Sequence, residues 1–292
     1  MKNISFAFFG TGPLAESVLK KLYDNGFIPN VVITKPDSLQ GRHLIMTPPS
    51  IKVWCELKSI PVLQPAKLDN EFYQKLQTTN YQLFIVASYG KIIPDDILNT
   101  PKHGVLNVHP SLLPKYRGPS PIESALLDGE KELGISIMKL DKEMDHGPIL
   151  VQNSFPIDPR ATAGTLEVTA GQIGGELLTQ VIEHYLNGSL IPKEQDHSKA
   201  TICKKINKEL GEIKLNDNTE VVRNKFRALT PWPSLYFFIE HGGKQVRVKV
   251  TDIDLINILN NTSTAKDIIL KVIPEGKKEM DFESFERGYL NK

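Results

Sequence analysis

The sequence predicts an α/β fold, a doubly wound and mostly parallel sheet domain, followed by a smaller all-β domain. Short apolar runs alternate with stretches of helical spacing up to about residue 186, the pattern of parallel strands joined by helical crossovers. A polar stretch then interrupts this texture, and beyond it the strands shorten and lie close together, as in a small barrel or sandwich. With 292 residues, two domains are expected, over 1–189 and 205–292, with 190–204 as a linker.

Apolar runs mark the expected strands of the first domain, and apolar residues three and four apart mark its helices. The first helix is indicated by Leu14, Val18 and Leu22, and the last is closed by Asn187 and Gly188, a common helix stop. The polar stretch 35–49 is expected to be a loop. In order, the elements are strand 4–9, helix 13–23, strand 31–34, helix 50–57, strands 61–63, 83–87 and 104–108, helix 122–127, strands 135–140 and 149–155, and helix 162–186.

The second domain is expected to hold one helix and several short strands. Helical spacing covers 220–228, and strands are expected over 235–240, 245–250 and 268–272. The run His241-Gly242-Gly243 predicts a hairpin turn between the first two strands. From Lys199 onward there are 17 Lys and Arg against 13 Asp and Glu, while the preceding residues hold 18 against 21. A mildly basic second domain favours a polyanionic partner.

Composition limits the cellular setting. Apolar residues make up 40% of the chain, and no segment approaches the roughly 18 consecutive apolar residues of a membrane span. The first ten residues lack a signal-peptide cleavage pattern. Cys55 and Cys203 are far apart and outside any C-x-x-C run, which fits a reducing compartment. We therefore expect a cytoplasmic protein without a membrane partner, acting as a monomer.

Asn107, His109 and Asp145 are the strongest catalytic candidates. Asn107 and His109 end the strand expected over 104–108, and residues two apart on a strand point to the same side. The carboxyl ends of parallel strands form the ligand crevice of such sheets. Asp145 follows in a turn between two later strands. An amide that steadies an oxyanion, with an imidazole and a carboxylate that move a proton, predicts an acyl-transfer enzyme.

Three other kinds of site are less consistent with the sequence. Gly10-Thr11-Gly12-Pro13-Leu14-Ala15 fits the dinucleotide pattern G-x-G-x-x-A, with Asp37 as a ribose ligand. Pro13 removes one N–H from the helix start, so a tight turn is favoured and no NAD is expected. His103, His109, His146 and Asp145 lack a zinc-ligand spacing, so no metal is expected. Ser111 is not in a G-x-S-x-G elbow.

Two runs together resemble the folate-dependent formyltransferases. They are N-V-H-P-S-L-L-P-K-Y-R-G, from Asn107 to Gly118, and the later D-x-x-x-D-x-G-x-I-L pattern that contains Asp145. The resemblance covers nearly the whole chain. It implies a Rossmann-like first domain, an OB-like barrel as the second, and 10-formyltetrahydrofolate as the formyl donor. It implies catalytic roles for Asn107, His109 and Asp145. The folate-contacting positions that it implies are Ser111, Leu112, Leu113, Pro114, Val86, Tyr89, Gly90 and Ile92.

Further features resemble the branch of the family that acts on initiator methionyl-tRNA. They are K-P-D-S-L-Q-G-R, which ends at Arg42, and R-A-L-T-P-W-P, from Arg227 to Pro233. The resemblance implies that Arg42 contacts the tRNA and that the formyl group goes to the α-amino group of methionine. The chain departs from the family at His146, where Thr is common, and after Arg42, where it reads His43-Leu44-Ile45.

The alternatives differ in acceptor or in class. A formyltransferase that acts on an amino sugar nucleotide would share the catalytic trio, because the trio identifies the chemistry and not the acceptor. An NAD-dependent oxidoreductase would use Gly10 and Gly12, and a folate or RNA binder without activity would not need Asn107, His109 and Asp145.

Overall fold

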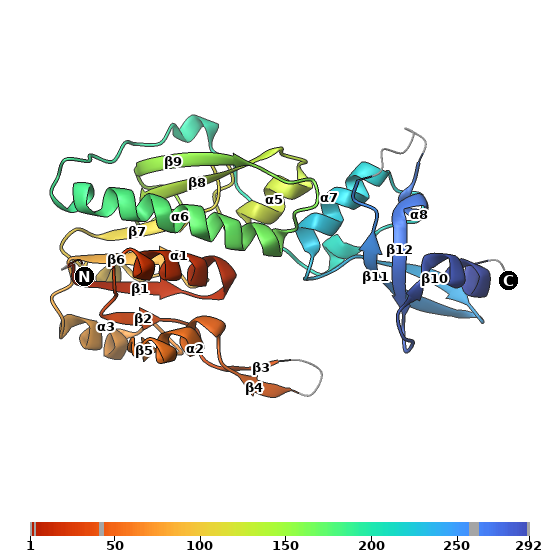
Figure 1. The fold of residues 1–292 in the computed structure, drawn as a ribbon, viewed down its shortest axis with the longest axis horizontal. Helices are drawn as coiled ribbons and strands as arrows, with labels where there is room; N and C mark the ends of the chain where they lie inside the picture. The colour runs from red at the N-terminus through yellow and green to blue at the C-terminus, as the bar shows by residue number, and fades with distance from the viewer. Residues whose placement is uncertain (1, 3, 41–43, 257–262, 291–292) are drawn as a thin grey trace. The chain divides into compact units, whose positions relative to one another are not determined.

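The computed structural model describes residues 2, 4–40, 44–256 and 263–290 (Figure 1). Contacts divide it into two compact units. Unit 1 comprises Met1–Pro121, Leu133–Phe155 and Glu167–Cys203, and unit 2 comprises Ile122–Glu132, Pro156–Leu166 and Lys204–Lys292. The second unit thus includes two short stretches from within the predicted first domain. The division of the chain into 1–189, 190–204 and 205–292 stays a prediction.

A seven-stranded sheet forms the centre of unit 1. Its strands in spatial order are β5 (Val62–Leu63), β2 (Val31–Ile33), β1 (Phe6–Gly10), β6 (Leu83–Ala87), β7 (Val105–His109), β8 (Glu132–Lys139) and β9 (Ile149–Pro156). The pairs from β5 to β7 are parallel, and β8 runs antiparallel to β7. The predicted doubly wound, mostly parallel sheet is confirmed. The strand order reverses between β1 and β6, where such sheets open a crevice at their carboxyl ends.

The helices of the α/β part follow the predicted order, with two additions. The expected helices correspond to α1 (Gly12–Asp24), α2 (Ser50–Leu57), α5 (Pro121–Leu127) and α6 (Ala163–Leu186). The sequence did not lead us to expect α3 (Asn70–Gln77) or α4 (Asp95–Leu98). Both are short, and α3 is capped by the Asp69 side chain, which accepts from the Phe72 N–H. Two turns of helix bury too few apolar residues to give a clear period.

Glycines let α6 lie close to the sheet and to α1, which runs beside it in Figure 1. A Cβ at Gly171 would come within 2.5 Å of the Leu14 carbonyl oxygen, and one at Gly174 within 2.5 Å of a Val108 methyl. A Cβ at Gly175 would meet Lys21. Val108 lies between Asn107 and His109 on β7, so this close contact helps to fix the strand that carries both residues.

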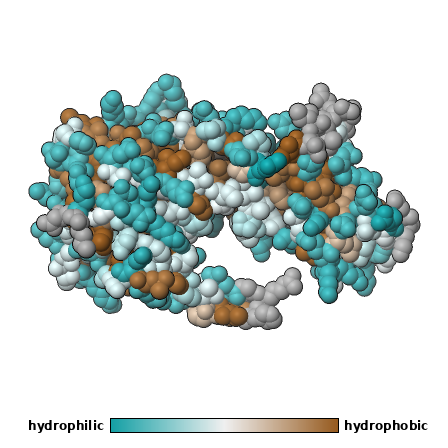
Figure 2. Space-filling view, in the orientation of Figure 1, coloured by the Kyte–Doolittle hydropathy of each residue, from teal (hydrophilic) through white to brown (hydrophobic). Residues whose placement is uncertain are grey.

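The stretch 35–49 was predicted to be a loop, and this was wrong. It contains a two-stranded antiparallel hairpin of β3 (Ser38–Gln40) and β4 (Ile45–Thr47), with Leu39 opposite Met46. The hairpin shows no buried face, so the alternation of apolar and polar residues that marks a strand is missing. Its side chains include apolar groups that are largely exposed, Leu39, Leu44, Ile45 and Met46 (Figure 2).

Unit 2 contains a four-stranded antiparallel sheet. Its order is β10 (Tyr236–His241), β11 (Lys244–Ile253), β12 (Ile269–Pro274) and β13 (Met280–Asp281). The turn predicted at His241-Gly242-Gly243 joins β10 to β11, and Gly242 and Gly243 both have positive φ angles. Besides most of α5, its helices include α7 (Thr219–Leu229), α8 (Ala265–Ile268) and α9 (Phe282–Phe285). The predicted small β domain is confirmed as an antiparallel sheet, and its closure into an OB-like barrel stays a prediction.

Short helical turns complete the described chain. They are η1 (His197–Lys199), η2 (Glu209–Gly211) and η3 (Glu286–Leu290). Within the described ranges, no helix combines the length and the apolar character needed to cross a bilayer.

Candidate active site

Strand β7 places Asn107 and His109 at its carboxyl end. Both are buried, with 8% and 4% of their surfaces exposed. Asn107 pairs with Val86 of β6 on one side and with Met138 of β8 on the other, so the strand is held from both sides. No hydrogen bond of the Asn107 side chain is found within the described part of the chain. A buried amide whose N–H groups are not used internally is available to a ligand.

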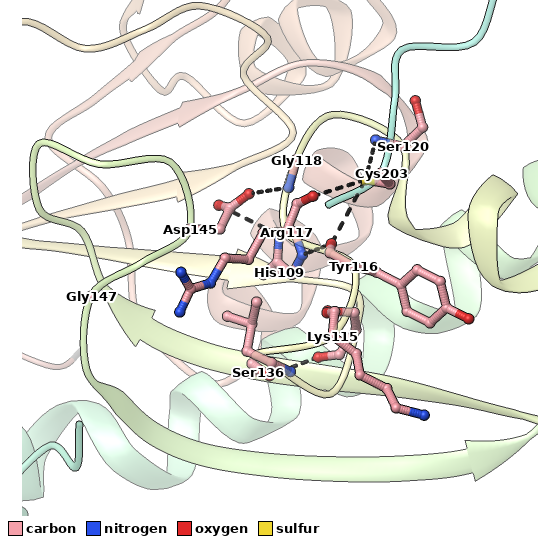
Figure 3. A network of polar contacts seen from close by, with 12 residues as sticks. His109, Lys115, Tyr116, Arg117, Gly118, Ser120, Ser136, Asp145, Gly147 and Cys203 are labelled. Atoms are coloured by element: carbon pink, nitrogen blue, oxygen red, sulfur yellow. Dashed lines mark hydrogen bonds and ion pairs between the residues drawn. The ribbon is translucent and has the colours of Figure 1, made fainter. Parts of the chain in front are cut away.

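The ring of His109 is anchored through one nitrogen. Its Nε2 lies 2.9 Å from the carbonyl oxygen of Tyr116, and because a carbonyl only accepts, Nε2 carries the hydrogen. Nδ1 then faces Asp145, 3.6 Å from Oδ1 (Figure 3). That distance is longer than a hydrogen bond. A water or a substrate amine at one side can contact both atoms at once, which is the arrangement that proton transfer requires.

Asp145 is held by the loop that follows β7. Its Oδ2 accepts from the N–H of Gly118 at 2.8 Å (Figure 3). Its backbone has a φ of 51°, in the left-handed region that costs free energy for residues other than glycine. Neighbouring contacts must therefore keep Asp145 in this conformation. The carboxylate is 12% exposed, and it reaches His109 with one oxygen while Gly118 binds the other.

The loop Ser111 to Pro114 is tied to β8 and β9 by side-chain hydrogen bonds. Ser136 donates to the Ser111 carbonyl at 2.6 Å and accepts from the Leu113 N–H at 3.1 Å. Gln152 donates to the Leu113 carbonyl at 2.9 Å. Ser111 and Leu113 are buried, Pro114 is half-buried, and Leu112 is exposed at 40% and packs against Gly134. Of the four positions predicted to contact folate here, Leu112 is thus the most accessible.

The second predicted folate-contacting stretch is divided between core and surface. Val86 and Tyr89 are buried in the cluster that also contains Phe9 and Phe84, whereas Gly90 is exposed and 94% of Ile92 is exposed. The Tyr89 hydroxyl has no hydrogen-bond partner in the described part of the chain, and burial raises the pKa of Tyr89 to about 12. The structure does not bring all four residues to one surface.

Unit 1 also contains a cavity of about 700 Å³. Residues from 95–104 and 139–146 line it, including Leu98, His103, Lys139, Asp141 and His146. Burial, and then the nearby Lys102 and Lys139, lower the pKa of His103. None of the residues predicted to contact folate is among its lining residues.

Several predicted or alternative positions lie elsewhere. Arg42 lies outside the described residues. The Asp37 carboxylate, the ribose ligand of the dinucleotide alternative, accepts from Gln64 at 2.7 Å and from Lys52 at 2.9 Å. These two contacts lower the pKa of Asp37. Asp37 is therefore engaged within the protein. Among the residues that the structure describes, no group of three or more His, Cys, Asp or Glu side chains is arranged to hold a metal ion.

Sequence reasoning missed three residues near Asp145: Arg117, Gln195 and His197. Arg117 is buried and donates to Gln195, which in turn donates to the Asp145 carbonyl at 3.0 Å. Arg117 lies within the run Asn107 to Gly118, on which the family resemblance rests, so this run could have marked it as a candidate. Gln195 and His197 lie in a polar stretch expected to be a linker, where no local pattern distinguishes them.

Comparisons with protein families agree over both parts of the chain. The formyl transferase family model matches residues 2–182, and the model of the formyl transferase C-terminal domain matches residues 205–265. A methionyl-tRNA formyltransferase from Dictyoglomus thermophilum is 39% identical over 302 residues, covering 97% of this chain and 96% of that protein.

Solved structures show a similar fold at lower identity. A methionyl-tRNA formyltransferase from Clostridium thermocellum superposes with a TM-score of 0.62 at 17% identity, covering 95% of this chain and 99% of that one. A 4-N formyltransferase from Francisella tularensis gives a TM-score of 0.64 at 18% identity, covering 87% and 98% of the two chains. At these identities, the likeness extends to the fold alone.

Proposed function

This chain belongs to the formyl transferase family, and we propose that it transfers the formyl group of 10-formyltetrahydrofolate to the α-amino group of methionine on initiator methionyl-tRNA. The resemblance predicted from the sequence is confirmed by relatives that match nearly the full chain. The identification of methionyl-tRNA as the acceptor is supported by this full-length similarity, which includes the second domain. The observation that supports the chemistry is that Asn107 and His109 are buried and that the partly buried Asp145 faces His109 at 3.6 Å.

The reaction starts when the methionine amine attacks the formyl carbon. The amine lone pair forms the new C–N bond, and the π pair of the carbonyl moves to oxygen. The Asn107 amide is free of internal hydrogen bonds in the described part of the chain and is suited to donate to that oxyanion. A fixed neutral donor of this kind is an effective oxyanion stabiliser. Collapse of the intermediate returns the π pair, and the bond from carbon to the folate nitrogen breaks.

Proton movement completes the transfer. The attacking amine must lose a proton, and the departing folate nitrogen must gain one. The gap between His109 Nδ1 and Asp145 Oδ1, at 3.6 Å, suits a group that touches both, either the amine itself or a water. Because Nε2 of His109 is engaged by the Tyr116 carbonyl, Nδ1 is the ring atom that exchanges the proton. The proposal requires no covalent intermediate on the protein.

The substrates are held by different parts of the chain in this proposal. Of the residues predicted to contact the folate, Leu112, Pro114, Gly90 and Ile92 are accessible, and Ser111, Leu113, Val86 and Tyr89 are buried. Arg42 contacts the tRNA in this proposal, and the described residues that follow it in the sequence, Leu44 and Ile45, are apolar and exposed. Since translation initiates in the cytoplasm, the protein is proposed to act there. It is also proposed to be a monomer, and light scattering should then give about the chain mass of 32.7 kDa.

One assay tests the proposed acceptor. The purified protein is given 10-formyltetrahydrofolate with methionyl initiator tRNA, an amino sugar nucleotide or glycinamide ribonucleotide, each in a separate reaction. Formyl transfer to the tRNA alone is expected. Transfer to the amino sugar nucleotide instead would overturn the proposed acceptor but retain the chemistry. Absence of transfer to any of the three would overturn both.

A further inference from the structure

The segment that links the two predicted domains lies against both loops of the candidate site. Lys193 exchanges two backbone hydrogen bonds with Ile149, which follows the Asp145 turn. The backbone N–H of Arg117 donates to the Thr201 carbonyl at 2.9 Å, and the backbone carbonyl of Arg117 accepts from the Cys203 N–H at 2.8 Å. The segment is therefore paired at one end with the strand after Asp145 and at the other with the loop after His109.

Gln195 lies between these two attachments and is 6% exposed. Its Nε2 donates to the carbonyl oxygens on either side of His146, that of Asp145 at 3.0 Å and that of Gly147 at 2.7 Å. Its Oε1 accepts from Nε and Nη2 of Arg117, at 3.2 and 2.6 Å. Because a guanidinium only donates, Arg117 fixes which end of the Gln195 amide faces the turn.

A pair of stacked histidines contacts the same terminal nitrogen of Arg117 that binds Gln195. The rings of His146 and His197 are parallel within 1°, with centroids 4.1 Å apart. His197 Nδ1 is 2.8 Å from Arg117 Nη2 and must be the acceptor, while His146 Nδ1 donates to Asp141 at 2.7 Å. His146 thus bonds to Asp141 and stacks on His197, and His197 is linked back to Asp145 through Arg117 and Gln195.

We propose that Gln195 is a positioning residue for Asp145, oriented by Arg117, and that the stacked pair of His146 and His197 holds Arg117 in place. Asp145 has a positive φ, so external contacts must hold its backbone, and the direction of its carboxylate depends on that backbone. The Gln195 amide grips the turn at both carbonyls, while Gly118 and His109 meet the carboxylate. The inference rests on the proposed function, in which Asp145 moves a proton.

Gln195→Glu separates positioning from simple stability. The new carboxylate keeps the acceptor for Arg117 and turns the contact into a charge-assisted pair. This gain offsets stability lost with the donated hydrogen bonds, so the unfolding midpoint in urea should stay close to that of the wild type. The same change removes the donor to the Asp145 and Gly147 carbonyls. The expected kcat for formyl transfer to methionyl-tRNA falls by roughly 10- to 100-fold, the range for a reacting group displaced by about 1 Å, with KM for both substrates unchanged.

Gln172→Glu is the matched control, because Gln172 is exposed on α6. The substitution adds the same negative charge as Gln195→Glu. A second readout needs no substrate: the amide proton resonance of Gly118, whose N–H donates to the Asp145 carboxylate. It should move in Gln195→Glu and stay in place in Gln172→Glu.

An unchanged kcat or an unmoved Gly118 resonance in a folded Gln195→Glu protein would overturn the positioning role. A loss of kcat matched by an equal loss of stability would overturn it as well. If the wild type transfers no formyl group to methionyl-tRNA, the proposed function fails, while the Gly118 resonance still decides whether Gln195 positions Asp145.

Discussion

His109 uses its two ring nitrogens for different tasks. Nε2 is bound to the Tyr116 carbonyl, and Nδ1 faces Asp145 at 3.6 Å. His109→Ala removes the proton-exchanging atom, and single-turnover formyl transfer should slow by about 10²–10⁴-fold, the usual contribution of an acid–base group. Rapid quenching with excess enzyme measures this step. Transfer at near the wild-type rate would show that another group moves the proton.

A substitution at His197 tests whether its hydrogen bond with Arg117 contributes to the positioning of Asp145. His197→Phe keeps a ring to stack on His146 and removes the acceptor for Arg117. One hydrogen bond contributes about 0.5–1.5 kcal/mol, so kcat should fall by no more than about tenfold, in the same direction as for Gln195→Glu. The control is His184→Phe, because His184 is exposed on α6 and bonds only locally to Ser189. Equal steady-state rates for the two variants would argue against the role of His197.

At the scale of the element, α6 depends on its glycines. Gly171 has no room for a Cβ, which would lie 2.5 Å from the Leu14 carbonyl oxygen and 2.6 Å from Ser17 Cβ. Gly171→Val should lower the free energy of unfolding by roughly 1–3 kcal/mol, the cost of overpacking. Urea unfolding measures the loss. Gly288→Val is a matched control, because a Cβ there meets no atom within 4 Å; an equal effect of both variants would show that packing against α1 is not the cause.

Element prediction failed where an element lacks a buried face. The hairpin of β3 and β4 was expected to be a loop, and α3 and α4 were not expected at all. By contrast, β6 and β7 consist entirely of buried residues and were anticipated to within a residue. One-sided burial leaves a period in the sequence, and complete burial leaves a continuous apolar run. Short or exposed elements are set by local caps and pairing, which leave no such period.

At the scale of the whole molecule, tRNA should be bound largely through its phosphates. KM for methionyl-tRNA is expected to rise steeply with salt, since each phosphate contact releases counterions, with a slope of about 0.7–0.9 per contact on logarithmic axes. Arg42→Ala should raise KM for tRNA and reduce that slope by roughly one contact, with KM for the folate unchanged. Steady-state kinetics between low and moderate salt measure both. A salt-independent KM for tRNA would contradict phosphate recognition.

The sequence by itself determined the α/β order, the small β domain and the candidate residues for the chemistry, whose catalytic roles stay a prediction. Asn107 and His109 could be found because they end an apolar strand, and Asp145 because it occupies a turn between two others. The family followed from the same runs, and relatives along the full chain confirmed it. These signals are local, since burial and turn chemistry act over a few neighbouring residues.

Only the tertiary structure decided what supports Asp145. Arg117 meets Gln195 across 78 positions and His197 across 80, and no local pattern encodes such contacts. In the sequence, His146 stands where Thr is common in the family. In the structure, it bonds to Asp141 and stacks on His197. Polar partners are selected by the geometry of the folded chain, because a hydrogen bond depends on distance and direction in space and leaves no period along the sequence.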